Sequence, residues 1–334
     1  MFYLGTQWVI RSIVPVHRGI FLLFVLLLTG PAIADDQAVL FEQSPALKLL
    51  GKMTKANREL TYKGRFTYEY GGAISTMEVM HTLQNGQVIE KLSHLSGAKR
   101  ELLRHSDMDS CSKPAEHLLS GIALGVSGDE KSFTDFYNVI LKEQGRIADR
   151  EVNVVHLVPK DKYRYGYVLA LDSETGLLLQ TMVIGTKKQV LERFQFVSIQ
   201  IGMLLDEAEL APTELSHYRL AEDKSPCSNS DSQNTSRWNA QWLPGGFVLA
   251  DQQLSEDQQV ETLVYTDGLA VFSVFIDAGE SGFRELQGQR GSTIAFLVNK
   301  QVNEKMYTIC VVGEVPAGTA RRVAEGIQFQ ALTQ

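Results

Sequence analysis

Short segments in which apolar and polar residues alternate make up much of this 334-residue chain. RFTYEY, STMEVMHTL and QVIEKLSHL follow one another, and the turn Gln84-Asn85-Gly86 separates the last two. Alternation with a period of two places apolar side chains on one face of a strand, and Asn-Gly between two such runs is typical of a hairpin. Successive runs of this kind predict an antiparallel sheet of about eight strands, which curls and needs cover over its concave face.

Three segments in the same part of the chain have a helical spacing of apolar residues, and we expect them to provide that cover. Pro45 suits the first turn of the first helix, because the backbone donors are unused there. The third segment carries Phe133, Phe136, Ile140 and Leu141 on one side. The expected helices span residues 45–57, 114–124 and 131–145.

Residues 1–34 have the features of a cleaved signal peptide. Two arginines precede the apolar run Gly19–Leu28, which is too short to span a bilayer. Ala32-Ile33-Ala34 then fits a cleavage site, so we expect an exported chain that begins at Asp35. An uncleaved membrane anchor is the minor alternative.

Composition divides the remaining chain into two expected domains. Residues 207–237 are polar and contain Pro, Ser and Asn, which is typical of a linker. The predicted class is α+β, with a large domain at 35–206 that forms a curved antiparallel half-barrel covered by helices. A smaller α+β domain is expected at 238–334, with an antiparallel sheet and one terminal helix.

The sequence GEVPAGTA, Gly313–Ala320, has the glycine spacing of a phosphate-binding loop, but its chemistry argues against that role. A P-loop requires Lys after the second Gly, whereas Thr319 follows Gly318 here, and Pro316 lacks a backbone donor. We therefore expect a strand, a turn and a helix with Thr319 as its N-cap. One helix face would be buried and the other exposed. The expected buried residues are Ala320, Val323, Ala324 and Ile327, and the outward ones are Arg321, Arg322 and Glu325.

Charge and cysteine content exclude several kinds of partner. Two of the 32 basic residues and none of the 39 acidic ones precede Asp35, so the expected mature chain has a net charge of −9. An acidic chain argues against nucleic acid as a partner. If a disulfide forms, Cys111 and Cys227 are the favoured pair because both lie in polar stretches, whereas Cys310 lies in an apolar run. Their spacing fits no metal site.

No arrangement of residues in the sequence predicts an enzyme. The sequence contains no HExxH motif and no GxSxG nucleophile elbow, and no pair of carboxylates stands out as a glycosidase couple. The histidines are isolated and are expected to be hydrogen-bonded structural residues. We therefore expect neither a catalytic site nor a cofactor.

Large apolar side chains are more frequent in the first domain than one thin core layer needs. Flexible methionines stand among them, and Met adapts to irregular spaces and varied ligands. One interpretation is a thick core; the other is a cavity between the sheet and the helices that admits an acyl chain. The candidate cavity residues are Met77, Met80, Phe133, Phe136, Ile140 and Met182.

Several blocks of the sequence resemble the RseB/MucB family, whose members are periplasmic regulators of the sigma-E envelope stress response. In the second domain the blocks are WLPGGF (242–247), YTDGLAVFSVFI (265–276), GQRGSTIAFLV (288–298) and CVVGEVPAGTARRVAEGI (310–327). In the first domain they are YKGRFTYEYGG (62–72) and the segment 149–180. The resemblance extends over nearly all of the expected mature chain, and the set of blocks is specific although each block alone is weak.

The resemblance implies a LolA/LppX-like, unclosed half-barrel followed by a separate α+β unit, in the periplasm. It implies a non-enzymatic role: the protein would bind the periplasmic segment of a membrane-bound anti-sigma factor of the RseA/MucA kind and shield it from site-1 proteolysis. Lipid or lipopolysaccharide in the large domain would release that partner. The alternative is a periplasmic lipid or lipoprotein carrier with the same cavity. Self-association stays open.

The resemblance identifies no compact motif for the partner site. Four arginines of the second domain would suit an acidic partner segment if they form a patch. The alternative is that they are scattered, solvated charges. These residues are Arg284, Arg290, Arg321 and Arg322.

Overall fold

The computed structural model describes most of the chain after residue 43, and Gln43–Gln334 form one compact unit. The expected signal peptide, the expected helix at 114–124 and both Cys111 and Cys227 lie outside the described residues. None of the helices described is long and apolar enough to cross a membrane. The described residues are 44–107, 134–213, 218–223, 236–255, 257, 259–279, 282 and 284–330.

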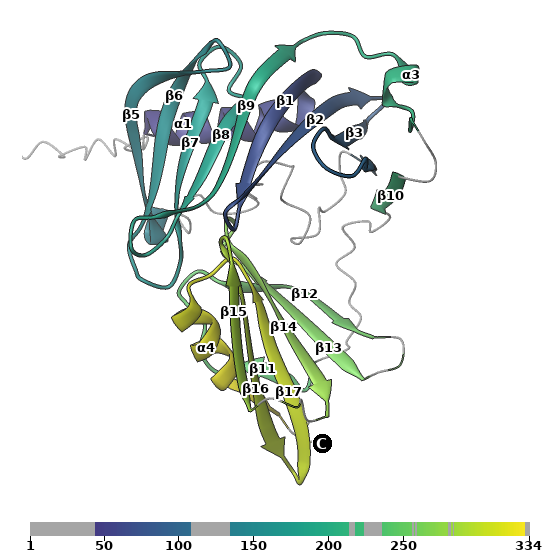
Figure 1. Cartoon of the computed structure of the whole chain (residues 1–334). Coiled ribbons are helices and arrows are strands. Elements are labelled where there is room, and N and C mark those ends of the chain that lie inside the picture. The colour runs from purple at the N-terminus through teal and green to yellow at the C-terminus, as the bar shows by residue number, and fades with distance from the viewer. Residues whose placement is uncertain are drawn as a thin grey trace, which may run out of the picture. The chain divides into compact units, whose positions relative to one another are not determined.

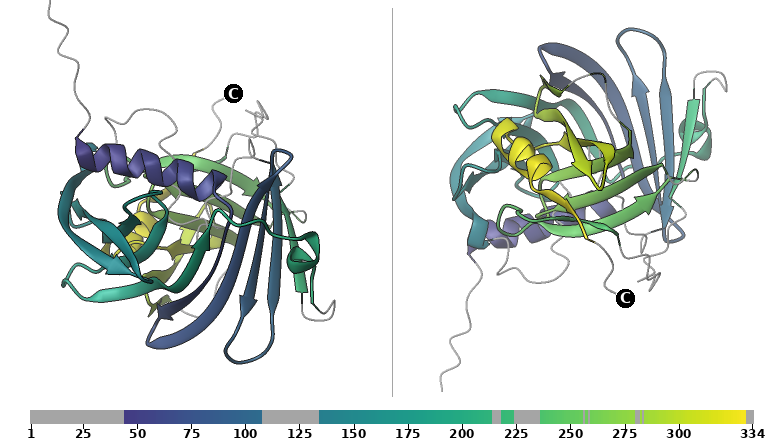
Figure 2. Two further views of the ribbon diagram at one scale, coloured as in Figure 1. Left: turned by 90° about the horizontal axis from the view of Figure 1, so that it is seen from above. Right: turned by 90° about the horizontal axis from the view of Figure 1, so that it is seen from below.

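The first helix, α1 (Pro45–Glu59), begins where the sequence predicts. The Ser44 side chain accepts a hydrogen bond from the Leu47 amide at 3.3 Å, and this caps the helix start. The helix buries one stripe of side chains, and it lies along the inner side of the curved sheet (Figure 2). The buried residues of this stripe are Ala46, Leu50, Met53 and Ala56.

A ten-stranded sheet forms the first part of the fold (Figure 1). Its order is β10-β4-β3-β2-β1-β9-β8-β7-β6-β5, so β1 joins the hairpins at one end to the meander at the other. All pairs are antiparallel except β10 with β4. The bounds are β1 Tyr62–Tyr70, β2 Ala73–Gln84, β3 Gln87–His94, β4 Glu101–Asp107, β5 Tyr137–Ile147, β6 Arg150–Pro159, β7 Gly166–Asp172, β8 Leu178–Ile184, β9 Val190–Ile201 and β10 Tyr218–Asp223.

The prediction of a helix at 131–145 is wrong, because β5 occupies most of that segment. β5 pairs with β6 through a turn at Ala148 and Asp149, which both have positive φ (51° and 65°). A two-residue turn of this kind matches the twist of paired strands and fixes a hairpin. The apolar spacing that suggested a helix leaves Ile140 and Leu141 exposed on the strand (38% and 42%). Long-range pairing has overridden local periodicity here.

Part of the segment expected to be a linker, 207–237, belongs to the first sheet. The short helix α3 (Glu207–Leu210) packs on β3, and β10 adds a parallel strand beside β4. Leu205 and Leu210 cover Met80 in a small apolar cluster. The polar composition of 207–237 concealed these contacts, because only a few apolar residues make them.

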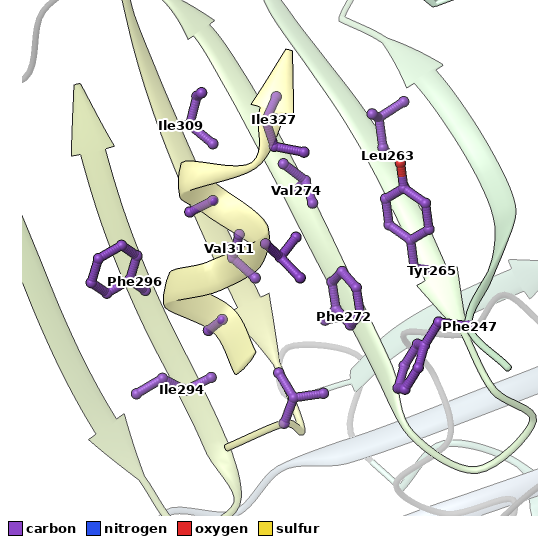
Figure 3. Close-up of a cluster of buried hydrophobic side chains, with 14 of the residues drawn as sticks. Phe247, Leu263, Tyr265, Phe272, Val274, Ile294, Phe296, Ile309, Val311 and Ile327 are labelled. Atoms are coloured by element: carbon purple, nitrogen blue, oxygen red, sulfur yellow. The ribbon is translucent and has the colours of Figure 1, made fainter. Parts of the chain in front are cut away.

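A six-stranded antiparallel sheet, in the order β12-β13-β14-β17-β16-β15, forms the second part of the fold. α4 (Ala317–Glu325) covers one face of it, and β11 (Trp238–Ala240) pairs with β18 (Ile327–Phe329) beside it. Figure 3 shows the core between α4 and the sheet, in which Phe272, Phe296 and Val311 are fully buried. The strand bounds are β12 Val248–Leu254, β13 Val260–Thr266, β14 Val271–Ala278, β15 Glu285–Arg290, β16 Thr293–Val302 and β17 Lys305–Gly313.

The stretch Gly313–Ala320 is the predicted strand, turn and helix start. The expected N-cap is wrong, because α4 begins at Ala317 and Pro316 occupies the cap position without a side-chain bond. Thr319 lies inside the first turn, and its hydroxyl donates to the Tyr163 carbonyl at 2.9 Å. The expected buried and outward faces of the helix are confirmed, since Ala320, Val323 and Ala324 are buried and the two arginines are exposed.

Truncation of Phe272 should destabilise the protein strongly. Its side chain is 1% exposed, and removing a buried phenyl group leaves a cavity that costs about 3–5 kcal/mol of unfolding free energy. Phe275, three residues along β14, points to the opposite face and is 37% exposed. We expect Phe275→Ala to cost well under half as much as Phe272→Ala in urea unfolding, and equal losses would contradict this assignment of faces.

Candidate functional site

Side chains fill the concave side of the ten-stranded sheet. Phe66 and Phe196 lie in its core, with ring centroids 5.8 Å apart, and Phe194 packs 4.7 Å from Phe66. A cavity of only about 20 Å³ lies among these rings, Tyr62 and Asn57 of α1. This space holds no acyl chain, so a lipid could enter only if α1 or the rings moved.

The structure does not bring the candidate lipid-cavity residues together. Met77 packs with the aromatic core, whereas Met80 belongs to the cluster under Leu205 and Leu210. Residues three apart on a strand point to opposite faces, so these two methionines cannot line one cavity. Ile140 is exposed, Met182 is half-buried in β8, and Phe133 lies outside the described residues.

The remaining candidate, Phe136, packs against the most deeply buried charge in the described part of the chain. Arg164 lies in the β6–β7 connection, its side chain is fully buried, and the Phe136 ring centroid is 4.8 Å from the guanidinium carbon. The Tyr137 and Phe247 rings lie 5.4 Å away. Aromatic faces attract a guanidinium, which compensates part of the loss of its hydration.

Two carboxylates complete this Arg164 cluster. Arg164 donates to Asp267 in the β13–β14 turn at 2.6 Å and to Asp161 at 3.2 Å, and it also donates to the Gly245 carbonyl. Tyr137 donates to the same Asp267 oxygen at 3.1 Å. Burial alone would lower the pKa of Arg164, but the charges of Asp267 and Asp161 and the hydrogen bond to Asp161 raise it, so the cation persists. The cluster therefore ties β5 and the β6–β7 connection to the second sheet.

The other oxygen of Asp267 stabilises the turn that carries it. It accepts hydrogen bonds from the amides of Leu269 and Ala270 at 3.0 and 2.8 Å. Leu269 in turn packs into the apolar cluster that contains Tyr165 and Tyr167 of the first sheet. One carboxylate thus fixes both the turn and its contact with the first sheet.

A second polar contact joins the two sheets at Glu192 of β9. Its carboxylate is buried, accepts from the Ser292 amide at 2.9 Å and from the Ser292 hydroxyl, and receives the Tyr68 hydroxyl at 3.0 Å. Nearby, the Tyr165 hydroxyl donates to the Val315 carbonyl at 3.0 Å. These bonds satisfy polar groups that would be costly to bury alone.

Glu314 lies beside this contact without a hydrogen bond to its carboxylate among the described residues. Burial, and then the negative charge of Glu192, raise the pKa of Glu314 to about 7. Its charge is also felt by Tyr68, Tyr165 and Tyr167, whose pKa values are raised chiefly by burial. The junction therefore contains a carboxyl group that changes charge near neutral pH.

The four candidate partner-binding arginines are exposed but do not form one free patch. Arg321 pairs with Glu285 and lies over the Phe296 ring. Arg322 stacks on Trp242 at 3.9 Å and donates to the Tyr163 hydroxyl at 3.0 Å. Arg290 lies over Tyr70 at 5.1 Å, and Arg284 is exposed.

The cysteine and metal-site predictions concern residues outside this junction. Cys310, on β17, is a free thiol that is half-buried rather than fully buried, and burial raises its pKa. Within the described ranges, no group of three or more His, Cys, Asp or Glu residues is placed to hold a metal ion.

The sequence analysis did not predict the Arg164 cluster. The only feature of the sequence that pointed to it is a charged residue inside the aromatic run KYRYGY.

These two sheets, each covered by its own helix, define a two-domain protein of the α+β class. The chain belongs to the MucB/RseB family: the model of the MucB/RseB N-terminal domain matches residues 45–214, and that of the C-terminal domain matches 232–328.

Named relatives of the chain are sigma-factor regulatory proteins. The chain is 32% identical to the sigma factor AlgU regulatory protein MucB of Pseudomonas aeruginosa over 93% of its length and 98% of that protein. It is 24% identical to the sigma-E factor regulatory protein RseB of Escherichia coli over 91% and 96%. A crystal structure of MucB in complex with MucA(peri) matches at 32% identity with a TM-score of 0.70, over 86% of this chain and 99% of that one.

Loss of the Arg164 side chain should destabilise the protein severely. Arg164→Met leaves Asp267 buried without its cation, which costs about 3–5 kcal/mol of unfolding free energy. Arg146→Met, which removes only an exposed ion pair with Asp149, should cost less than about 1 kcal/mol. The measurement is chemical unfolding of both variants, and a loss below about 1 kcal/mol for Arg164→Met would refute the assigned role.

Stability should fall as pH rises through neutrality, because of Glu314. A carboxyl whose folded pKa is raised to about 7 from 4.5 favours the fold while it is protonated. Its contribution is complete below pH 4.5 and is lost as pH rises through about 7, with a size of roughly 3 kcal/mol. Glu314→Gln should flatten the unfolding free energy between these pH values, whereas the exposed control Glu325→Gln should not. If the unfolding free energy changes with pH equally in wild type and Glu314→Gln, Glu314 is not the cause of the pH dependence.

Proposed function

We propose that this protein is a periplasmic regulator that binds the periplasmic segment of a membrane-bound anti-sigma factor. Bound, it shields that segment from site-1 proteolysis, and lipid or lipopolysaccharide releases it. The observation that carries the proposal is the similarity, over 99% of the solved MucB chain, to MucB bound to MucA(peri). The expected leader at 1–34, large domain at 35–206 and small domain at 238–334 are part of the same proposal. Of the expected linker at 207–237, residues 207–210 and 218–223 pack with the first sheet.

The second sheet supplies the proposed contact for the partner. All four arginines are exposed: Arg290 ends β15, Arg284 directly precedes that strand, and Arg321 and Arg322 lie on α4. Stacking of Arg322 on Trp242 and of Arg290 on Tyr70 orders their guanidinium groups before a partner binds. Ordered cations lose less side-chain entropy when they meet carboxylates, so this arrangement suits an acidic, extended segment.

Lipid release would follow from the filled interior of the first sheet. Since the space beneath α1 is about 20 Å³, an acyl chain can enter only a rearranged form of this domain. A ligand shifts a conformational equilibrium only if it binds one form better than the other. Lipid would therefore favour an opened form, and it would displace the partner to the extent that the partner prefers the closed one.

A lipid or lipoprotein carrier is the second candidate, because the sheet has an apolar concave face. The connection between the sheets argues for the regulator. Arg164, Glu192 and Tyr165 fix the second sheet to the first through buried polar groups, which a carrier made of the first sheet alone would not need.

Protection of the partner is the experiment that tests the proposed function. The protein is mixed with the purified periplasmic segment of the anti-sigma factor of the same organism, and the site-1 protease is added with and without lipopolysaccharide. We expect slow cleavage without lipopolysaccharide and faster cleavage with it. Unchanged cleavage together with no complex in calorimetry would overturn the regulator and leave the carrier.

Charge reversal on the second sheet should weaken the complex. Arg284→Glu with Arg322→Glu should reduce affinity for the segment about tenfold or more, because each removes an attraction and adds a repulsion. Lys142→Glu with Lys187→Glu, two exposed charges on the first sheet, is the matched control and should change affinity little. Calorimetry measures both, and equal losses would locate the contact elsewhere.

A further inference from the structure

The six-stranded sheet has one face that α4 covers and an opposite face, which we call the outer face. Among the described helices, α4 packs on this sheet, against β16 and β17, on the side that buries Phe272, Val311 and Phe296 (Figure 3). Successive side chains of a strand point to opposite faces, so every second residue of these strands points away from α4. Phe275 and Leu286 on the outer face are 37% and 48% exposed.

Four apolar side chains form a continuous row across the outer face. Phe275 of β14 lies in register with Cys310 of β17. Cys310 is in turn paired with Leu297 of β16, and Leu297 is paired with Leu286 of β15. Side chains directly opposite each other on neighbouring strands have Cβ atoms about 5 Å apart, so the row is one apolar strip across four strands.

A second row of the outer face, next to this strip, carries small side chains. The strands place its members side by side in the order Ser273, Val312, Ala295 and Gly288. Large side chains therefore stand beside hollows. Two sheets that pack face to face lie about 10 Å apart and interdigitate their side chains, which requires relief of this kind.

Charged side chains are nearly absent from the outer face, although they make up 21% of the chain. The strands β13 to β17 direct only Asp277 and Arg290 to it, and each of these lies at or next to the end of its strand. Depletion of charge is typical of the buried centre of a protein interface. An acidic or a basic segment would find no opposite charge in the middle of this face.

A second copy of the chain is the occupant that this face fits best. The expected mature chain has a net charge of −9, so two copies repel each other unless uncharged surfaces meet. The outer face is uncharged at its centre and is therefore complementary to itself. Strand spacing and rise give it an extent of roughly 24 by 26 Å, or about 600 Å² per copy, which is near the lower limit for a specific interface.

We propose that two copies of this protein associate through their outer faces as a symmetric dimer. A two-fold contact uses the same patch on both copies. Centred on β17, it places Cys310 beside Cys310 of the second copy and Phe275 against Leu297. The helix α4 lies on the other side of each sheet, so Arg321 and Arg322 stay accessible, and the proposal does not depend on the proposed function.

Sedimentation equilibrium of the exported chain, from low to several hundred micromolar, tests this dimer. An interface of this size predicts dissociation in the micromolar range, with monomer at the lowest concentration and dimer at the highest. Phe275→Glu with Leu286→Glu should weaken the dimer about tenfold or more, because it brings carboxylates together in an uncharged contact. The matched control is Ile74→Glu with Val197→Glu, two exposed apolar residues of the first sheet (69% and 53%), which should leave the dimer unchanged. Thermal unfolding checks that both variants fold.

Cross-linking through Cys310 is a second readout that leaves the outer face unchanged. After Cys111→Ser and Cys227→Ser, Cys310 is the one remaining thiol of the chain. A short bismaleimide adds one thiol to each of its two double bonds, so it should join two chains at concentrations where the dimer forms.

A protein that stays monomeric at every concentration overturns the proposal. A dimer that the Phe275/Leu286 change does not weaken, or that the control weakens equally, overturns it as well. Sedimentation as a dimer without any cross-link through Cys310 would place the contact away from β17 and contradict the symmetric arrangement.

Discussion

A buried arginine is the constraint on which the joining of the two sheets depends. Arg164 has no access to water, and a guanidinium without hydration must find partners for its charge and its donors. It finds them in Asp267, Asp161 and a backbone carbonyl, inside a set of aromatic rings drawn from both sheets. Separation of the second sheet would break the Arg164–Asp267 ion pair and the hydrogen bond to the Gly245 carbonyl, so the contact is specific.

The Glu192 contact has a different physical character. Its carboxylate accepts from Ser292 of the second sheet and from Tyr68 of the first, but Glu314 adds an unpaired acid next to it. Two carboxyl groups in a poorly hydrated place repel each other when both are ionised. The junction thus combines the Arg164 cluster, whose charges are paired, with the Glu192 contact, whose net charge depends on pH. The Glu314 charge therefore makes the contact between the two sheets sensitive to pH near neutrality.

The sequence predicted much of the architecture and little of the chemistry. The alternating runs predicted most strands of both sheets, and the apolar spacing of Ala320, Val323 and Ala324 predicted the buried face of α4, because burial on one face leaves a local period. The same reasoning misassigned β5, since Tyr137, Ile140 and Leu141 have helical spacing but pair with β6 as a strand. It also grouped Met77 with Met80, which the pleat of β2 sends to opposite sides.

The sequence by itself determined what local periodicity and turn chemistry can encode: two antiparallel sheets, a first helix with Pro45 in its first turn and an amphipathic last helix, in a chain whose blocks resemble one family. What only the tertiary structure decided is which side chains meet across long distances in the chain. Arg164 and Asp267 are about a hundred residues apart, as are Glu192 and Ser292, and no spacing rule links such pairs. Their partnership is set by the register of ten strands and six, because a one-residue shift turns every side chain of a strand to the other face.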